Sequence, residues 1–270
     1  KKIPLEEIVG KIERGERLGI DEAKAFLAAS DKLLGGKALD TFYDAARREA
    51  KRYHSLRTLE CTRIFVAAQP ADAVQSEVAA TSSKMIYLAF APGHGDLNFI
   101  TSVISKAAQT RTVAAFSPEH LFSLAAASKQ KVLSLVQMLA HAGLSLVPGA
   151  FIAKATDVSA SDETFSVLMQ LHKFKLRTSA ELPLSYSDAE KVTHLAKVRE
   201  FEDRTHLFTH LCLRLDTKFS EKELLRTVAI CRLMLDNLAT ISLSDYNLDQ
   251  SGFISDDLLK RCAELGLNQN

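Results

Sequence analysis

The 270-residue sequence predicts an α/β fold, a complete or incomplete (β/α) barrel of the TIM type with helices in front of it. From residue 57 onward, short apolar segments alternate with segments of helical periodicity, an order that favours βα units and a parallel sheet over a sandwich or a helical bundle. The length suits one large domain. We therefore expect a single domain over 1–270, with a helical lead-in over 1–56 and the barrel over 57–270.

The lead-in is predicted to contain three helical runs. Apolar residues recur at helical spacing over 5–12. A second run covers 23–34, where Asp21 is placed to cap its start and Gly35-Gly36 to end it. The third run, 38–53, leads into the first strand.

Seven apolar segments are expected to be strands, and a segment that can form a helix follows each of them. In chain order the predicted strands are 60–67, 85–90, 112–116, 145–147, 178–184, 207–213 and 240–243. Seven units make a barrel that is incomplete or barely closed, and the last predicted helix, 255–265, is placed to plug one end. In such barrels the functional residues lie just after the strands, at their carboxyl ends.

Capping residues mark several of the helices between these strands. Ser117-Pro118 places a hydroxyl at the N-cap and a proline in the first turn. Ser187 with Glu190, and Ser220 with Glu223, have the spacing of capping boxes. Gly143 is expected to end the helix over 132–142.

Charge and cysteine content narrow the class of protein. There are 34 basic and 33 acidic residues, so no overall field attracts nucleic acid or an anionic membrane, and we expect neither as a partner. No apolar run reaches the ~18 residues needed to cross a bilayer, and the charged start argues against a secretory signal. Together with four widely spaced cysteines, which suit reduced thiols, this predicts a cytoplasmic protein.

Two glycine-containing segments are candidate ligand loops. Gly93 and His94 follow the second predicted strand, and Gly149 follows the fourth, where a glycine lets the backbone approach a ligand closely. An ordinary turn is the more common structure for such segments. Among the side chains of the first loop, His94 is the candidate for chemistry.

Charged residues of the fifth and sixth predicted strands are the other candidates. Glu181 lies inside an otherwise apolar strand, so it needs either solvent or a partner. Arg214 and Asp216 end the sixth strand and can supply that partner or bind an anionic group. His206 and His210 are four residues apart, but they fall at the start of a predicted strand and form no HExxH-type pair, so we expect no bound metal.

Several stretches together resemble one family, the radical S-adenosylmethionine enzymes of the futalosine route to menaquinone, aminofutalosine synthase and cyclic dehypoxanthinylfutalosine synthase. The most specific stretch is RTVAICRLMLDN at 226–237. The others, in the same order as in the family, are IERGERL at 12–18, AFSPE at 115–119, the segment 132–149 ending in AGLSLVPG, LRTSA at 176–180, and 194–205, which contains HL, VRE and DRT. The resemblance implies a radical-SAM-like barrel.

The parts of the sequence that depart from the family are those that carry its chemistry. Family members hold a [4Fe–4S] cluster with a CxxxCxxC loop after the first strand, whereas 61–70 contains Cys61 alone, and one thiolate cannot hold four irons. The family's glycine pair after the second strand, its PGGGAE segment and its GHIET segment are also changed, at 89–92, 148–151 and 185–188. We expect no cluster and no other cofactor, although S-adenosylmethionine or a nucleoside remains a candidate ligand.

The sequence therefore predicts a homologue without radical SAM activity, a binding or scaffolding protein that pairs with an active enzyme of menaquinone biosynthesis. Two alternatives remain open. The first is a cluster-independent enzyme, with Glu181 as acid or base, His94 assisting, and Arg214 holding a carboxylate or phosphate. The second is a small-molecule binder that holds a nucleoside-like ligand at Gly93, Gly149, Arg214 and Asp216 without turnover.

Overall fold

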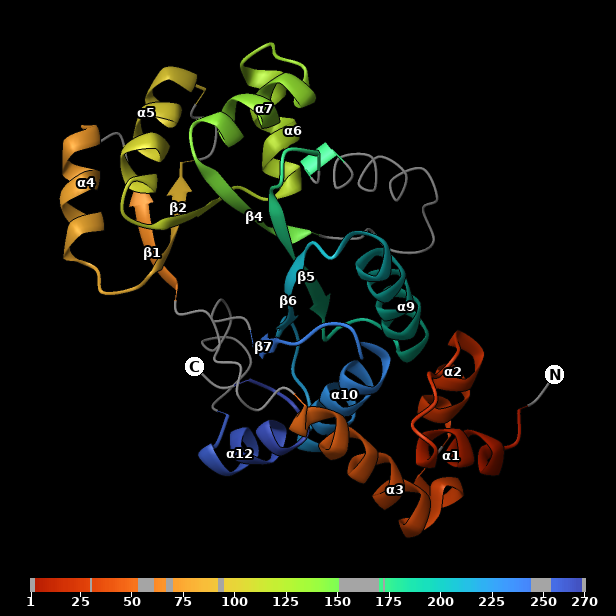
Figure 1. The fold of residues 1–270 in the computed structure, drawn as a ribbon. Coiled ribbons are helices and arrows are strands. Elements are labelled where there is room, and N and C mark those ends of the chain that lie inside the picture. Colours follow the sequence, from red (N-terminus) through yellow and green to blue (C-terminus); the bar gives the residue numbers. More distant parts are fainter. Residues whose placement is uncertain are drawn as a thin grey trace. The chain divides into compact units, whose positions relative to one another are not determined.

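The structure is a computed structural model that describes residues 3–29, 31–52, 61–66, 70–91, 95–150, 170–171, 173–243 and 254–268 (Figure 1). It contains a seven-stranded sheet in which the strands follow one another in chain order. The strands are β1 (Cys61–Val66), β2 (Met85–Phe90), β3 (Thr112–Ala115), β4 (Leu144–Ala150), β5 (Arg177–Pro183), β6 (Phe208–Arg214) and β7 (Ile241–Leu243).

Every strand pair with a described register is parallel, for example Ile64 opposite Leu88 in β1 and β2. Parallel strands in sequential order, with helices between them, are the arrangement of (β/α) barrels. Each predicted strand coincides with an observed one, and only β4 extends well beyond its expected end. Residues 60 and 67 of the first predicted strand lie outside the described residues.

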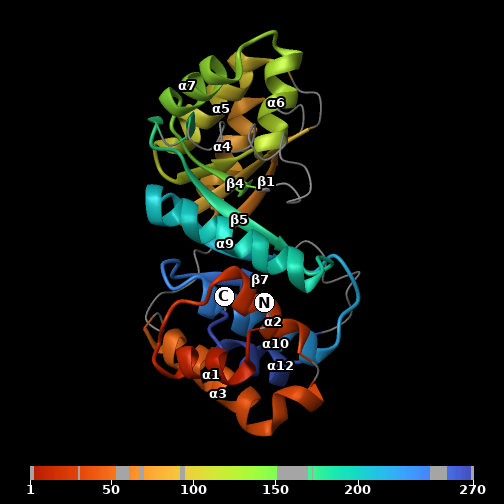
Figure 2. The ribbon, with the colours of Figure 1, turned by 90° about the vertical axis from the view of Figure 1, so that its right-hand side faces the viewer.

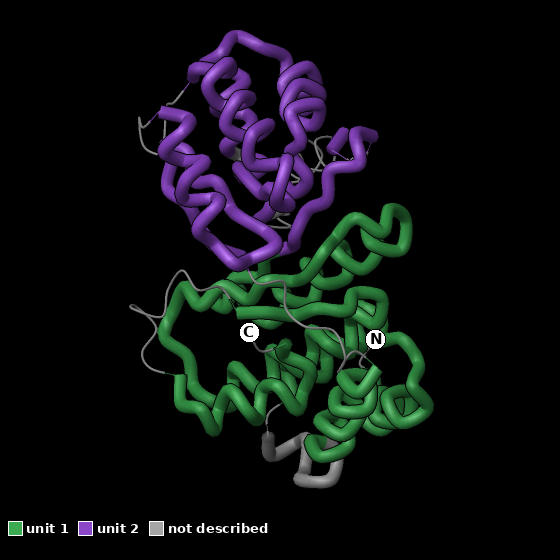
Figure 3. Tube along the Cα trace, turned by 60° about the vertical axis from the view of Figure 1, so that its left-hand side comes forward, with its two compact units in different colours: residues 1–58, 154–156, 181–270 green, residues 59–153, 157–180 purple. Residues whose placement is uncertain are grey.

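Contacts along the chain divide it into two compact units (Figure 3). Unit 1 comprises residues 1–58, 154–156 and 181–270, and unit 2 comprises 59–153 and 157–180. The expectation of one domain over the whole chain stays a prediction.

Unit 2 contains β1 to β4 and the helices α4 (Ala71–Ala80), α5 (Leu97–Ala108), α6 (Pro118–Ala127) and α7 (Val132–His141). One face of its strands is buried: Ile86, Leu88 and Val113 have no exposed surface. The predicted caps are confirmed, because the Ser117 side chain accepts a hydrogen bond from the backbone N–H of His120 and Gly143 follows α7 with a φ of +102°.

Among its described residues, unit 1 contains the end of β5, β6, β7 and six helices. The helices are α1 (Leu5–Glu13), α2 (Ile20–Ala28), α3 (Asp31–Lys51), α9 (Asp188–Thr205), α10 (Glu221–Met234) and α12 (Asp256–Glu264). Ser187 and Glu190 form the predicted reciprocal capping box, and the Ser220 side chain accepts from the N–H of Glu223.

The C-terminal helix, α12, packs against α10. Beyond it, Asn268 exchanges two hydrogen bonds with the backbone of Ile241, 2.7 and 2.8 Å long. Ile241 is the first residue of β7, so the segment after α12 caps the start of that strand. The expectation that the last helix plugs one end of a barrel stays a prediction.

The lead-in forms helices whose boundaries differ from the expectation. Gly35 and Gly36 lie inside α3 and do not end a helix. Two glycines weaken a helix by about 1 kcal/mol each, a cost that burial of its later residues, such as Phe42 and Ala46, can offset. The N-cap of α2 is Gly19, whose N–H donates to Glu22 Oε2 at 2.7 Å, so Asp21 is not the cap.

Among the described residues, the helices are all too short or too polar to cross a lipid bilayer.

Candidate functional site

The carboxyl ends of β5 and β6 bring three of the predicted site residues together. Arg214 Nη1 lies 3.8 Å from Glu181 Oε2, and Arg214 Nη2 lies 3.5 Å from Asp216 Oδ2. The three side chains are between 18% and 35% exposed. The pairing of Glu181 with an arginine, expected from the sequence, is confirmed.

Asp216 is held in place by the segment that follows β5. Its two carboxylate oxygens accept hydrogen bonds from the N–H and the hydroxyl of Ser185, at 2.9 and 2.7 Å. Burial acts to raise the pKa of Asp216, but these hydrogen bonds and the positive charge of Arg214 outweigh it, so the pKa lies below its ordinary value. We call Glu181, Ser185, Arg214 and Asp216 the β5–β6 group.

The charge of the β5–β6 group limits what it can bind. It holds two carboxylates and one guanidinium, so two negative charges already face the positive charge of Arg214. An added carboxylate or phosphate would meet two like charges within the range of strong Coulomb interaction. The arrangement therefore favours a ligand that donates hydrogen bonds, through hydroxyl or amino groups, over an anion.

One face of β6 carries further polar side chains that sequence reasoning passed over. Leu211 and Leu213 are fully buried, which leaves His210, Cys212 and Arg214 on the opposite face of the strand. Burial lowers the pKa of His210 to about 4, so its imidazole is neutral at pH 7. The alternation of leucine with polar residues was the signal that could have identified this face.

His206 and His210 have separate structural surroundings. His206 ends α9 in the left-handed conformation, with a φ of +53°. His210 lies inside β6, where its Nδ1 is 2.9 Å from Thr209 Oγ1. In the described part of the chain, no three histidine, cysteine, aspartate or glutamate residues are grouped so as to hold a metal ion.

Gly149 lies in a strand and not in the expected turn. β4 continues to Ala150 through a bulge between Val147 and Ala150, and the bulge accommodates Pro148. Gly149 has a φ of +77°, and its N–H donates to Ser179 Oγ at 2.9 Å. That N–H is therefore engaged by the protein itself. The other loop candidates, Gly93 and His94, lie outside the described residues.

Cys61 is at the wrong end of β1 for a cluster ligand. It is the first residue of the strand, opposite Met85, so the 61–66 segment is strand and not loop. The strand rises about 17 Å from Cys61 to Val66, whose carboxyl end is where the family's cluster loop begins. The residues that follow, 67–70, are Ala-Ala-Gln-Pro and contain no cysteine.

The other three cysteines are placed elsewhere. Cys212 lies in the middle of β6, while Cys231 in α10 and Cys262 in α12 are completely buried. Burial raises the pKa of both helical thiols to about 12, which disfavours the thiolate that iron needs. The cysteines of this chain thus do not fit the ligand set of a [4Fe–4S] cluster at the carboxyl end of β1.

Three of the stretches that resemble the family meet in a polar network of unit 1. Arg17 donates from Nε to Asp236 at 2.6 Å and from Nη1 to Asp203 at 2.8 Å. Asn237 donates to Asp203 at 2.8 Å and to the carbonyl of Arg199 at 2.9 Å. The hydrogen bond from Arg17 holds the pKa of Asp203 below its ordinary value. We call these five residues the Arg17 network.

The Arg17 network connects the lead-in to the helices that follow the later strands. Arg199 of α9 donates to the carbonyl of Leu18, ahead of α2, at 3.0 Å and to that of Met234 in α10 at 3.3 Å. The GERL, VRE and LMLDN stretches are thereby joined although they lie far apart in the sequence. Sequence reasoning found these motifs but had no signal that they contact one another.

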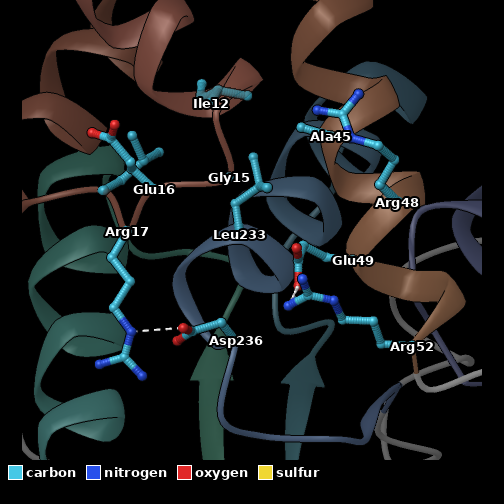
Figure 4. Close-up of a pocket in the computed structure, with 11 residues that line it drawn as sticks. Ile12, Gly15, Glu16, Arg17, Ala45, Arg48, Glu49, Arg52, Leu233 and Asp236 are labelled. Carbon is cyan, nitrogen blue, oxygen red and sulfur yellow. Dashed lines mark hydrogen bonds and ion pairs between the residues drawn. The ribbon is translucent and has the colours of Figure 1, made fainter.

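A cavity of about 60 Å³ lies beside this network, between the α1–α2 turn, α3 and the end of α10 (Figure 4). Its lining includes Arg17, which points to Asp236, and Arg52, which pairs with Glu49 at 2.9 Å. Three arginines and three carboxylates line it in total, so their charges cancel. The cavity has no net charge with which to select an ion.

Comparison with known proteins tests the resemblance. No protein-family model matches the chain. An alignment 144 residues long, which covers 46% of this chain and only 39% of the other protein, shows 25% identity to cyclic dehypoxanthine futalosine synthase of Halalkalibacterium halodurans. The fold matches that of the FeFe-hydrogenase maturase HydG from Carboxydothermus hydrogenoformans with a TM-score of 0.72, over 98% of this chain and 69% of that one, at 13% identity.

The predicted resemblance is confirmed. The likeness to HydG, which covers nearly the whole chain, shows a shared fold of the TIM-barrel type. The likeness to the synthase agrees with the resemblance seen in the sequence and covers less than half of the chain.

Proposed function

We propose that this chain is a radical-SAM-like homologue that assembles no [4Fe–4S] cluster and acts as a binding or scaffolding protein in the futalosine route to menaquinone. The observation that carries the proposal is the absence of cysteine from the segment after β1, with Cys61 at the opposite end of that strand. Radical SAM chemistry starts at a cluster held by three thiolates, and this chain offers none where they are needed.

The Arg17 network supports the second half of the proposal. Three of the family-like stretches join the lead-in to α9 and α10 by hydrogen bonds, and the residues that make these bonds are outside the segments that depart from the family. A chain that holds its family-like stretches together and lacks the cluster ligands suits a role in binding. We expect its partner to be an active enzyme of the same route.

Two measurements test this proposal. Incubation of the anaerobically reconstituted protein with dithionite and S-adenosylmethionine should yield no 5′-deoxyadenosine, whereas sustained formation of that product would refute the loss of radical chemistry. Calorimetric titration with purified cyclic dehypoxanthine futalosine synthase should show saturable binding in the micromolar range or tighter. If neither a heat of binding nor co-migration in gel filtration is seen with each protein at 100 µM, a concentration of about the Kd of the weakest transient complexes, the chain is not a scaffold for that enzyme.

The β5–β6 group favours a second candidate, a binder of a nucleoside-like ligand. Its carboxylates are partly exposed at the carboxyl ends of the strands, where ligands of such barrels bind, and they can accept hydrogen bonds from ribose hydroxyls. If chemistry remains, Glu181 is the candidate acid or base and His94 the second group. Arg214 serves the ligand less directly, because two carboxylates already oppose its charge.

Thermal-shift measurements with S-adenosylmethionine, futalosine derivatives and nucleosides test this candidate. A ligand at 100 times its Kd stabilises the folded chain by about 2.7 kcal/mol. Glu181→Gln should abolish that stabilisation, while Glu200→Gln, which alters an exposed carboxylate on α9, should preserve it. A shift that survives Glu181→Gln would place the ligand elsewhere.

A further inference from the structure

The turn between β5 and α9 is fastened to the end of β6. The chain passes from β5 into α9 through residues 184–187 (Figure 2). The N–H of Leu184 donates to the carbonyl of Arg214 at 2.9 Å, and Ser185 donates to both carboxylate oxygens of Asp216, at 2.9 and 2.7 Å. The turn thereby fixes the Asp216 side chain at both of its oxygens.

The two carboxylates of the β5–β6 group differ in exposure and in their distance from the guanidinium. The Asp216 side chain is 18% exposed and lies 3.5 Å from Arg214, whereas that of Glu181 is 30% exposed and lies 3.8 Å away. Although burial acts to raise it, the pKa of Asp216 lies below its ordinary value, so this carboxylate is ionised at neutral pH. Asp216 is therefore a fixed negative charge beside Arg214, while Glu181 is more open to solvent.

We propose that Asp216 sets the charge selectivity of this site by excluding anions from Arg214. The inference rests on the second candidate function, the binding of a nucleoside-like ligand at the β5–β6 group. It narrows the ligand class to uncharged nucleosides, in preference to their phosphorylated forms. The site would thus select its ligand partly by repelling a close relative of that ligand, which is a common basis of specificity.

The exclusion follows from the charges around Arg214. Phosphate is a common ligand at the carboxyl ends of barrel strands, and a guanidinium suits it because it offers several N–H donors and a permanent positive charge. Here Asp216 lies near one terminal nitrogen of that guanidinium and Glu181 near the other. Two negative charges and one positive charge leave the group at −1, so an entering phosphate is repelled.

The substitution Asp216→Asn separates the charge of this side chain from its hydrogen bonds. An asparagine has nearly the same shape, and its amide oxygen can still accept from the N–H of Ser185. The charge of the group rises from −1 to zero, because Arg214 is then opposed by Glu181 alone. Arg214 should then be able to pair with an added phosphate.

Titration with inorganic phosphate at constant ionic strength tests the exclusion without any nucleoside. Asp216→Asn should bind phosphate about tenfold more tightly than the wild type, or better, because a like charge has been removed beside the arginine. Glu181→Gln should gain less, since solvent screens the more exposed carboxylate. Addition of Arg214→Gln to Asp216→Asn should abolish the gain. Glu200→Gln removes an exposed carboxylate of α9 instead, and as the matched control for net charge it should behave like the wild type.

Titration with adenosine and adenosine 5′-monophosphate tests the consequence for ligand choice. The wild type should prefer adenosine, and Asp216→Asn should shift the ratio of the two affinities towards the monophosphate by about tenfold. Circular dichroism verifies that each variant is folded. Asp216→Ser, which keeps an oxygen near Ser185, takes the place of Asp216→Asn if that variant does not fold.

Three results of the phosphate titration would overturn the inference. The first is a wild type that binds phosphate as tightly as Asp216→Asn does, and the second is a gain that survives Arg214→Gln. The third is a gain in Glu181→Gln as great as that in Asp216→Asn, which would assign the exclusion to Glu181. If the wild type binds neither adenosine nor its monophosphate, the second candidate function fails for these nucleosides, and the phosphate titration still decides the role of Asp216.

Discussion

The Arg17 network and the β5–β6 group are both built from arginine and aspartate, yet they differ in what they connect. In the network, Arg17 bridges two carboxylates at 2.6 and 2.8 Å and joins the lead-in to α9 and α10. In the β5–β6 group, Arg214 lies 3.5 and 3.8 Å from its carboxylates, at the ends of two neighbouring strands. The first is a tight, long-range connection and the second a loose, local one.

The two regions therefore have different expected roles, the Arg17 network in stability and the β5–β6 group in chemistry. The network is made of the stretches that resemble the radical SAM enzymes, whereas the segments after β1, β2, β4 and β5 are those that depart from them. The contacts that join distant elements do not depend on what is bound at the carboxyl ends of the strands. We therefore expect substitutions in the family-like stretches to reduce stability strongly, and substitutions at the strand ends to affect it little.

The largest effect is expected for Arg232 of the RLMLDN stretch. It is fully buried and donates to the carbonyls of Leu238, Ala239 and Gly266, at 2.9, 3.2 and 2.8 Å. Arg232→Ala should lower the free energy of unfolding by about 3 kcal/mol or more, because buried carbonyls lose their donors. Urea denaturation measures the change, with exposed Arg48→Ala as the control. Equal free energies of unfolding for the two variants would contradict the expected contribution of the family-like stretches to stability.

The pH dependence of stability tests whether His210 is buried in β6. His210 has a pKa of about 4 when folded, against 6.5 when unfolded. The folded pKa is the lower one, so the stabilising effect is complete above pH 6.5 and is lost as the pH falls towards 4. The loss amounts to as much as about 3 kcal/mol. His210→Gln should flatten the profile between pH 4 and 6.5, and an unchanged slope would show that His210 is not buried.

Substitution of Arg17 is expected to have a smaller effect, because the side chain is 48% exposed. Arg17→Ala should cost about 1 kcal/mol at pH 7 and low salt, after allowance for solvent screening. The pKa of Asp203 is lowered in the fold, so this contribution is complete above the ordinary aspartate pKa and disappears as the pH falls through the lowered value. A double-mutant cycle with Asp203→Asn measures the coupling, and a coupling near zero at pH 7 would contradict a tight network.

The smallest effect is expected at Glu181. Its distance of 3.8 Å from Arg214 and its partial exposure make the pair weak, and Asp216 continues to oppose the arginine when Glu181 is neutral. Glu181→Gln should change the free energy of unfolding by less than about 0.5 kcal/mol. Denaturation alongside Arg17→Ala gives the comparison directly. A greater loss of stability in the Glu181 variant than in the Arg17 variant would contradict the roles assigned to the two regions.

Much of the fold was predictable because strands and caps leave local signals. Apolar runs identified all seven strands, and Ser117, Ser187 and Ser220 marked helix starts by their own hydrogen-bonding chemistry. Errors arose where tertiary packing overrides a local preference. Gly35-Gly36 continues a helix because α3 is held by its neighbours, and Pro148-Gly149 fits into β4 through a bulge.

The candidate site was only partly predictable. Glu181 was expected to pair with an arginine because a carboxylate in an apolar strand needs a partner, and Arg214, one of the two candidates, is paired with it. The Arg17 network was not foreseen, since Arg17 lies 186 residues from Asp203 and 219 from Asp236, separations over which sequence patterns carry no contact information.

The iron and acid-labile sulphide content of anaerobically reconstituted protein tests the central claim most directly. With the cysteines where the fold puts them, the wild type should retain less than a tenth of an iron per chain after desalting and show no absorbance near 400 nm. Cyclic dehypoxanthine futalosine synthase, treated in parallel, verifies the procedure. Four irons and four sulphides per chain, bound stoichiometrically, would contradict the account.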